Sequence, residues 1–217
     1  MPTHLPPTEL LADYAHGAAS PGVSLLVATH LTYAPESRAT VDALENVGGV
    51  LLADEQPVAM AASALDDVMA KLDAKGGSSF RETVATVTAE GEAWMPATLR
   101  EALGIGSGDI PWRFRLPGVS EYDLPGFEGE HVSLLRARPG CGIPQHTHEG
   151  AELTLVLSGA MADGGMVYEV GDVAVNSEAD DHCPRIVGEG TCYCLVVMDG
   201  RLRFTGTFSR ALNILAE

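Results

Sequence analysis

The sequence of 217 residues predicts an α+β protein with two domains, a small helical bundle over residues 1–75 and a β-barrel over residues 91–217. Three observations predict this division. Apolar residues recur at helical spacing through the first 75 residues. The run Lys75-Gly76-Gly77-Ser78-Ser79 has the composition of a flexible linker, which we place at residues 76–90. Short β-prone runs separated by glycine turns then follow, as in an all-β sandwich or barrel.

The first three helices are predicted from their start and stop residues. Thr8 is expected to cap a helix that ends at Ala15, and Ser20 followed by Pro21 matches an N-cap with proline at the first helical position. Pro35 can open a third helix, which Gly48-Gly49 should weaken. These helices present apolar residues along one side, so we expect them to pack together.

A fourth helix is expected after Ser63, which can serve as its N-cap. Its apolar residues follow the i, i+3, i+4, i+7 spacing of one helical face, namely Leu65, Val68, Met69 and Leu72. We expect this stripe to pack into the bundle, because short helices draw most of their stability from packing.

The second half of the chain is predicted to be mainly β-structure. A short helix is expected over residues 95–104. The runs richest in β-branched and aromatic residues are expected to be strands, at residues 112–114, 131–135, 153–157, 171–175 and 192–198.

The charge balance excludes some classes of function. Lys and Arg total 13 and Asp and Glu total 30, which gives a net charge of -17 and makes direct nucleic-acid binding improbable. Residues 1–75 alone carry 3 basic and 10 acidic side chains. The N-terminus has neither a basic start nor an apolar run, and no stretch is long enough to span a bilayer, so we expect a cytoplasmic protein without membrane contact. An acidic surface suits a basic protein partner.

The motif that carries the most chemical information contains two histidines and a glutamate. His146, His148 and Glu152 share parity, so on a strand their side chains project from one face, and His182 is the candidate fourth ligand. Imidazoles with a carboxylate suit zinc, iron, manganese or nickel. A lone HxH is common, and the alternative is that these are surface or core histidines. Glu149 has the other parity and is expected to face solvent.

Two of the four cysteines lie beside these ligands in the sequence. Cys141 stands within the motif and Cys183 follows His182, so a redox role is one hypothesis, and burial as small apolar side chains is the other. Cys192 and Cys194 share a strand face and are expected in the core. We expect all four cysteines to be thiols.

The spacing of Gly140, His146, His148, Glu152 and Gly159 resembles the first motif of the cupin family, G(X)5HXH(X)3EX6G. The second motif is matched at Gly171 and His182 but lacks the PxG turn. The resemblance implies a double-stranded β-helix, or jelly-roll, barrel that holds one divalent metal, zinc first among the candidates. It also implies a possible homodimer through the barrel.

The helical half resembles the zinc-binding anti-sigma domain in the segments 11–17, 25–31, 37–39 and 47–49. A helical anti-sigma domain followed by a cupin is similar to the arrangement of ChrR-type anti-sigma factors. The resemblance implies that the helical domain sequesters an extracytoplasmic-function sigma factor from RNA polymerase. It also implies that the cupin domain is required for the response to singlet oxygen or related oxidants.

The sequence departs from that family at the helical zinc site. The family motif is H-x3-C-x2-C with another histidine near the N-terminus; here His4 and His30 remain, but Ala34 and Ser37 replace the cysteines. Structural zinc takes four ligands, usually with thiolates among them. We therefore expect no structural zinc in the helical domain, and His4 and His30 as polar side chains left without their metal.

The alternative function is a cupin metalloenzyme such as a dioxygenase acting on a small molecule, since the same ligands can leave open positions on a metal. The complete set of four candidate ligands favours the enzyme. The lack of an identifiable substrate-directing residue, and a helical half that an enzyme would not need, favour a regulator.

Overall fold

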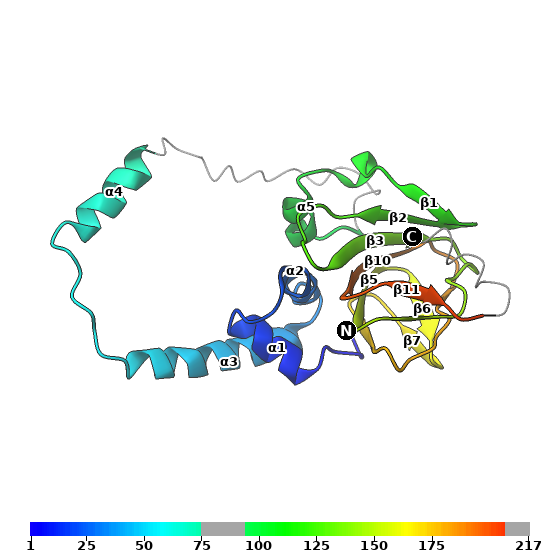
Figure 1. Ribbon diagram of the computed structural model, residues 1–217, viewed down its shortest axis with the longest axis horizontal. Coiled ribbons are helices and arrows are strands. Elements are labelled where there is room, and N and C mark those ends of the chain that lie inside the picture. Colours follow the sequence, from blue (N-terminus) through cyan, green and yellow to red (C-terminus); the bar gives the residue numbers. More distant parts are fainter. Residues whose placement is uncertain (75–93, 207–217) are drawn as a thin grey trace.

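The computed structural model describes residues 1–74 and 94–206, so the predicted linker at 76–90 lies outside the described residues. Helices dominate the N-terminal part and strands the remainder (Figure 1). The helices are α1 (Thr8–Ala15), α2 (Pro21–His30), α3 (Pro35–Ala53), α4 (Ala64–Ala74) and α5 (Ala97–Leu103), with a 3-10 turn at Ser107–Asp109.

The strands form antiparallel sheets that make up the barrel. The largest sheet has the order β1-β2-β3-β10-β5-β8, a three-stranded sheet has the order β7-β6-β9, and β11 pairs with β4. Their bounds are β1 (Arg113–Leu116), β2 (Val119–Asp123), β3 (His131–Ala137), β4 (His146–His148), β5 (Glu152–Ser158), β6 (Ala160–Asp163), β7 (Met166–Tyr168), β8 (Val173–Asn176), β9 (Arg185–Val187), β10 (Cys192–Met198) and β11 (Leu202–Phe204).

The central strands of the six-stranded sheet are buried on both faces. On β5, Leu153, Leu155 and Leu157 belong to one apolar cluster together with Leu26 of α2 and Leu99 of α5. The alternate residues of β5 face the barrel interior, where Val156 packs in a second cluster with Met161, Ile186 and Cys194 among others. This explains why β5 and β10 read as nearly continuous apolar runs rather than as an alternating pattern.

Helices α1, α2 and α3 form a three-helix unit around Leu11, Val27 and Val41. The predicted start of α2 is confirmed, because the Ser20 hydroxyl accepts a hydrogen bond from the Val23 amide and Pro21 occupies the first turn. The prediction for Thr8 is wrong. Thr8 is the first helical residue, and the preceding Pro7 supplies the carbonyl that accepts the first helical hydrogen bonds.

Helix α4 does not join this unit, so the prediction that its apolar stripe packs into a bundle is wrong. Leu65 is 71% exposed and Met69 51% exposed, and Val68 and Leu72 are exposed too. Helix α3 runs through Gly48-Gly49 to Ala53, and its last turns also expose apolar side chains. The chain from residue 54 to 63 carries α4 away from α1–α3, and no other described element covers its apolar stripe (Figure 1).

The helical part docks on the barrel through α2, which lies against β5 and β10 beside α5 (Figure 1). At the start of α2, the Gly22 amide donates to Glu130 Oε2 at 2.9 Å and the Ser20 hydroxyl donates to the other carboxylate oxygen. A Cβ atom on Gly22 would lie 2.7 Å from Val132 Cγ2, so the absence of a side chain permits this close approach. No helix in residues 1–74 or 94–206 is long and apolar enough to cross a membrane.

We predict that Gly22→Ala destabilises the chain, since the added methyl group must push α2 off the sheet. Overpacking of this kind costs about 1–3 kcal/mol, which exceeds the roughly 1 kcal/mol that alanine gains over glycine inside a helix. The control is Gly48→Ala, where the new Cβ meets nothing within 4 Å and should stabilise the helix. Urea unfolding should therefore shift in opposite directions for the two variants, and equal shifts would contradict the packing argument.

Candidate metal centre

The two histidines of the motif come from one strand and the glutamate from the next. His146 and His148 are the ends of β4, and both rings are buried. The chain then turns through Gly150, and Glu152 is the first residue of β5. The prediction that all three side chains project from a single strand is therefore wrong. Because β4 pairs with β11 while β5 belongs to the six-stranded sheet, the carboxylate reaches the imidazoles from a different sheet.

His182 lies beside His146 through a pair of backbone hydrogen bonds. The two residues form an isolated antiparallel bridge in which each amide donates to the carbonyl of the other at 3.0 Å. Their ring centroids are 4.3 Å apart. This bridge brings together two residues that are far apart in the sequence and explains how the candidate fourth ligand reaches the motif.

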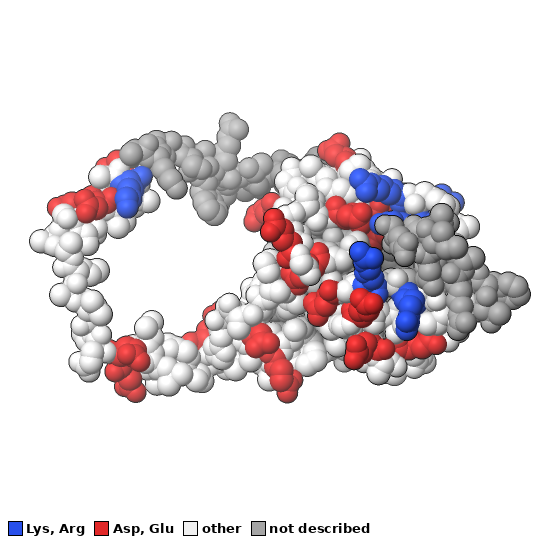
Figure 2. Space-filling view, viewed as in Figure 1, with Lys and Arg blue, Asp and Glu red and all other residues white. Residues whose placement is uncertain are grey.

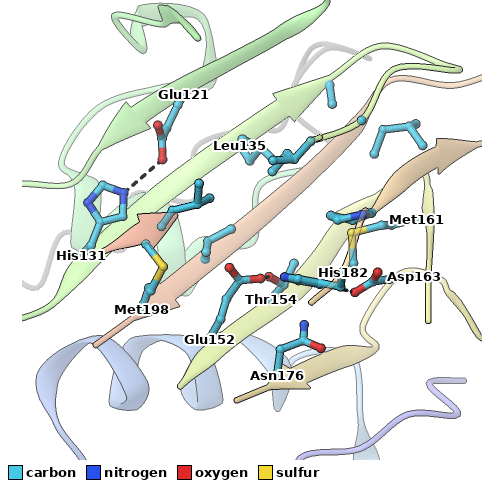
Figure 3. A pocket seen from close by; sticks show the side chains of 17 residues that line it. Glu121, His131, Leu135, Glu152, Thr154, Met161, Asp163, Asn176, His182 and Met198 are labelled. Carbon is cyan, nitrogen blue, oxygen red and sulfur yellow. Dashed lines mark hydrogen bonds and ion pairs between the residues drawn. The ribbon is translucent and has the colours of Figure 1, made fainter. Parts of the chain in front are cut away.

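The potential ligand atoms of His146, Glu152 and His182 all lie within 4.8 Å of one another. His148 is adjacent to this group rather than inside it, with its ring centroid 5.5 Å from that of His182 and 6.4 Å from that of His146. The structure thus gathers all four predicted residues in one buried region, with three of them closest together. Figure 3 shows Glu152 and His182 pointing into the same pocket.

Each of the three histidines is held through its Nδ1 atom. His146 Nδ1 donates to the Pro144 carbonyl at 2.9 Å, His148 Nδ1 to the Gly150 carbonyl at 3.1 Å, and His182 Nδ1 to Asp163 Oδ2 at 2.6 Å. The three Nε2 atoms are buried and have no hydrogen-bond partner in the described part of the chain. A hydrogen bond on one ring nitrogen leaves the other as the lone-pair donor, which is the arrangement of metal-bound histidine. The residues therefore fit a divalent metal ion.

Asp163 was not predicted as part of this site. It ends β6, is buried, and holds His182 in place (Figure 3). In the sequence, Asp163 stands four residues after Gly159 and directly before Gly164-Gly165. An acidic residue is common before such a turn, so its position alone does not indicate a part in the site. Carboxylates that bind the outer nitrogen of a histidine ligand fix its tautomer and orientation.

Burial governs the proton equilibria of the ligands. Burial and the neighbouring His182 lower the pKa of His146 to about 4, and burial raises the pKa of Glu152. For His182, burial acts to lower the pKa, but the Asp163 hydrogen bond and the charge of Glu152 outweigh it and raise the pKa. Buried carboxylates without a cation are costly, so this environment favours a bound positive ion.

A cavity of about 60 Å³ lies next to Glu152 and His182. Its walls are largely apolar and include Leu135, Met161 and Met198 (Figure 3). A cavity of this size has room for a few water molecules. A larger cavity of about 330 Å³ shares part of this wall and is also lined by Arg115 and Phe204.

A second group of possible ligands, Glu121, Asp123 and His131, lies within the same 4.8 Å limit. Its charges are already balanced within the protein. Arg115 pairs with both carboxylates, and His131 pairs with Glu121 (Figure 3). Because Arg115 already supplies a positive charge to both carboxylates, we interpret these residues as an ion-pair network.

The cysteines stand apart from the candidate ligands. Neither Cys141 nor Cys183 belongs to the ligand group: Cys141 packs at the edge of the interior cluster, and Cys183 is exposed with its thiol near the Ile143 carbonyl. Cys192 and Cys194 are buried in the core as predicted, with sulfur atoms 3.6 Å apart. All four are free thiols.

The helical positions at which zinc was considered do not come together as a group of possible metal ligands in residues 1–74 and 94–206. Neither His4 nor His30 belongs to a group of three possible ligands in the part of the chain that the structure describes. Both ring nitrogens of His30 are engaged, Nδ1 with the Gly171 carbonyl and Nε2 with the Ser37 hydroxyl, each at 2.8 Å. His4 Nδ1 bonds Asp172. Both histidines thus have hydrogen-bond partners within the protein, and the hydroxyl and carboxylate beside them are not the thiolates that structural zinc usually takes.

Together these features define a two-domain protein in which a helical unit docks on a cupin-type barrel with a candidate metal centre inside. A family model described as the ChrR cupin-like domain matches residues 101–200. The anti-sigma-E factor ChrR of Cereibacter sphaeroides is 37% identical over 196 residues, which is 90% of this chain and 89% of that protein. The chain belongs to the ChrR family of anti-sigma factors.

The same similarity holds in three dimensions. A chain in the crystal structure of Rhodobacter sphaeroides SigE in complex with the anti-sigma ChrR matches this structure with a TM-score of 0.76 at 34% sequence identity. The match covers 90% of this chain and 98% of that one. The likeness therefore includes the helical part as well as the barrel.

We predict that Asp163→Asn weakens metal binding about 10- to 100-fold, the usual effect of losing a carboxylate that orients a histidine ligand. The asparagine keeps the size of the side chain but removes the charge that holds His182. Metal affinity measured by competition with a chelating dye tests this, with exposed Glu149→Gln as the control. An affinity that falls equally in both variants would contradict the role of Asp163.

We also predict that chelation lowers the thermal stability of the purified chain. A ligand present at a thousandfold excess over its dissociation constant stabilises the folded state by about 4 kcal/mol. For a chain of this size that corresponds to a melting temperature lower by roughly 10 °C after metal removal. Calorimetry with and without EDTA measures it, and a His146→Ala variant should be insensitive to EDTA.

Proposed function

We propose that this chain is a cytoplasmic anti-sigma factor that binds an extracytoplasmic-function sigma factor through its helical part. Binding keeps the sigma factor from RNA polymerase. The barrel holds one divalent metal ion and is required for the response to singlet oxygen or related oxidants. The observation that carries this proposal is an apolar surface on α3 and α4 that nothing in the described chain covers.

That surface, which we call the docking face, begins in the second half of α3 and continues to the end of α4. Its large apolar side chains are all exposed, and they are Val47, Val50, Leu51, Leu52, Val58, Met60, Leu65, Val68, Met69 and Leu72. Monomeric proteins rarely leave so many large apolar side chains in water along one segment, and exposed apolar surface of this extent marks interaction sites. An extended pair of helices with apolar faces can lie across a folded partner.

The charges around the docking face suit a basic partner. Residues 35–74 hold eight acidic side chains against Arg38 and Lys71. Figure 2 shows carboxylates at intervals along both helices. A sigma factor must bind DNA and polymerase, so it offers basic and apolar surfaces. Charge would mainly raise the association rate, while the apolar anchors would set the lifetime of the complex. A stable inhibitory complex needs an interface of roughly 2,000 Å² or more.

The proposed metal ligands are His146, His148, Glu152 and His182. Zinc is the first candidate and iron, manganese and nickel are the others, because imidazole and carboxylate ligands accept all four. When bound, the ion would fix these side chains and supply a Lewis-acidic centre inside the barrel. Asp163 holds the His182 ring, and the Pro144 and Gly150 carbonyls hold the other two rings. The barrel is also the proposed site of any homodimer contact.

Regulation requires that a change in the barrel alter the conformation or the contacts of the helical part. The contact of α2 with β5 and β10 supplies a physical connection between them. A signal received in the barrel can release the sigma factor only if the two states of the chain bind that factor with different affinity. Membership of the ChrR family favours this regulatory function over the dioxygenase alternative, which predicts oxygen uptake with a small-molecule substrate.

We predict that Met69→Ser weakens binding of the extracytoplasmic-function sigma factor encoded beside this chain by about tenfold or more, since loss of an apolar anchor from an interface costs upward of 1 kcal/mol. The matched control is Met166→Ser on the barrel strand β7, since Met166 is 48% exposed and Met69 51%. Calorimetric titration of the two purified proteins measures both affinities. Equal losses in the two variants, or no stable complex with the unmodified chain, would refute the docking face.

A further inference from the structure

The turn at Gly171-Asp172, between β7 and β8, is held by two separate segments of the helical part. The N-terminal arm reaches it first. The Thr3 and His4 amides donate to Asp172 Oδ1 at 2.6 and 3.0 Å, and His4 Nδ1 donates to Oδ2 at 3.1 Å. The Val173 amide donates back to the His4 carbonyl at 2.9 Å. The arm therefore binds the barrel through backbone and side chain together.

Helix α2 supplies the second contact through its last residue. His30 is completely buried and its Nδ1 donates to the Gly171 carbonyl. Burial lowers the pKa of His30, so the ring is neutral and its Nε2 accepts a hydrogen bond from the Ser37 hydroxyl of α3. One imidazole thus connects α2, α3 and the barrel turn, with both of its nitrogens satisfied.

We propose that the positions considered for structural zinc form instead a metal-free clasp, in which His30, Ser37 and His4 fasten the helical part to the Gly171-Asp172 turn of the barrel. The residue types agree with this assignment. Serine can donate to a neutral imidazole nitrogen, whereas a cysteine at position 37 would be a weak donor. Ala34 is buried and brings no polar group that would need a partner.

Asp172 is the centre of the clasp on the barrel side. Its side chain is almost fully buried. Burial acts to raise the pKa of this carboxyl, but hydrogen bonds from the His4 and Glu169 amides and the His4 ring outweigh it and lower the pKa. A carboxylate that accepts several hydrogen bonds is held firmly, because removing any one of them leaves a buried charge less well compensated.

The turn is also fixed to the strand that carries Glu152. The Gly171 amide donates to the Val156 carbonyl at 2.8 Å, and the Val156 amide donates to the Asp172 carbonyl at 3.0 Å. The clasp therefore joins the helices to a rigid part of the barrel rather than to a free loop. This makes it the polar counterpart of the apolar contact between α2 and the sheet.

The clasp predicts a specific effect of Asp172→Asn in the full-length chain. An amide nitrogen in place of Oδ1 faces the Thr3 and His4 amides, and in place of Oδ2 it faces the Glu169 amide, so at least one hydrogen bond is lost together with the negative charge that strengthens the others. The amides of Thr3, His4 and Val173 should then exchange with solvent about tenfold faster, as follows from loss of roughly one net hydrogen bond to a charged group. The central amides of β10 should keep their protection. Exchange followed by NMR measures all of these amides separately.

The matched control is Asp42→Asn, the same change at an exposed site on α3. It should leave the three clasp amides unchanged. Metal analysis of the unmodified chain and of His30→Gln adds an independent outcome. One ion per chain in both supports the clasp. A second zinc ion that is lost in His30→Gln, or clasp amides unaffected by Asp172→Asn, would overturn it. Because His30 is fully buried and its replacement risks unfolding the helices, metal analysis of the unmodified chain and exchange in Asp172→Asn test the two parts of the proposal without it. Neither measurement depends on sigma binding.

Discussion

The candidate metal centre depends on three buried imidazole nitrogens that have no hydrogen-bond partner among residues 1–74 and 94–206. Each histidine is fixed on its outer side by a carbonyl or by Asp163, so none can turn to satisfy the inner nitrogen elsewhere. Buried polar atoms without hydrogen bonds destabilise a fold by about 1–3 kcal/mol each. A bound cation removes that cost for all three at once, and it offsets the charge of Glu152. The barrel interior therefore combines an apolar cluster around Val156 and Met161 with a polar pocket whose donor atoms fit a cation.

The two faces of the six-stranded sheet contact different parts of the protein. Its inner face supports the candidate metal centre, and its outer face supports α2 and α5 through Leu153, Leu155 and Leu157. The helical part is accordingly not an independent unit beside the barrel, because its second helix completes the outer core. The remaining helices extend beyond this contact, where their apolar side chains are available to another protein.

Much of the candidate site could be predicted from sequence, since the spacing of His146, His148 and Glu152 is set by local strand and turn geometry. What could not be predicted depended on long-range contacts. The separation of β4 from β5 into different sheets depends on pairing partners that the motif does not contain. Asp163 holds His182, and Asp172 accepts hydrogen bonds from His4, so the role of each depends on a residue that is distant in sequence. The stripe on α4 has the spacing of a packed face, and periodicity alone cannot distinguish a core contact from an intermolecular one.

Strand β5 begins at the candidate ligand Glu152, and four residues later Val156 bonds the turn that the helices hold. This short stretch has no tolerance for a change in length. Because successive side chains alternate between faces, one inserted residue would turn either the carboxylate outward or the leucines inward. Homologous chains should therefore accept insertions in the loops around this strand but preserve its four-residue interval, even where the helical zinc ligands have been lost.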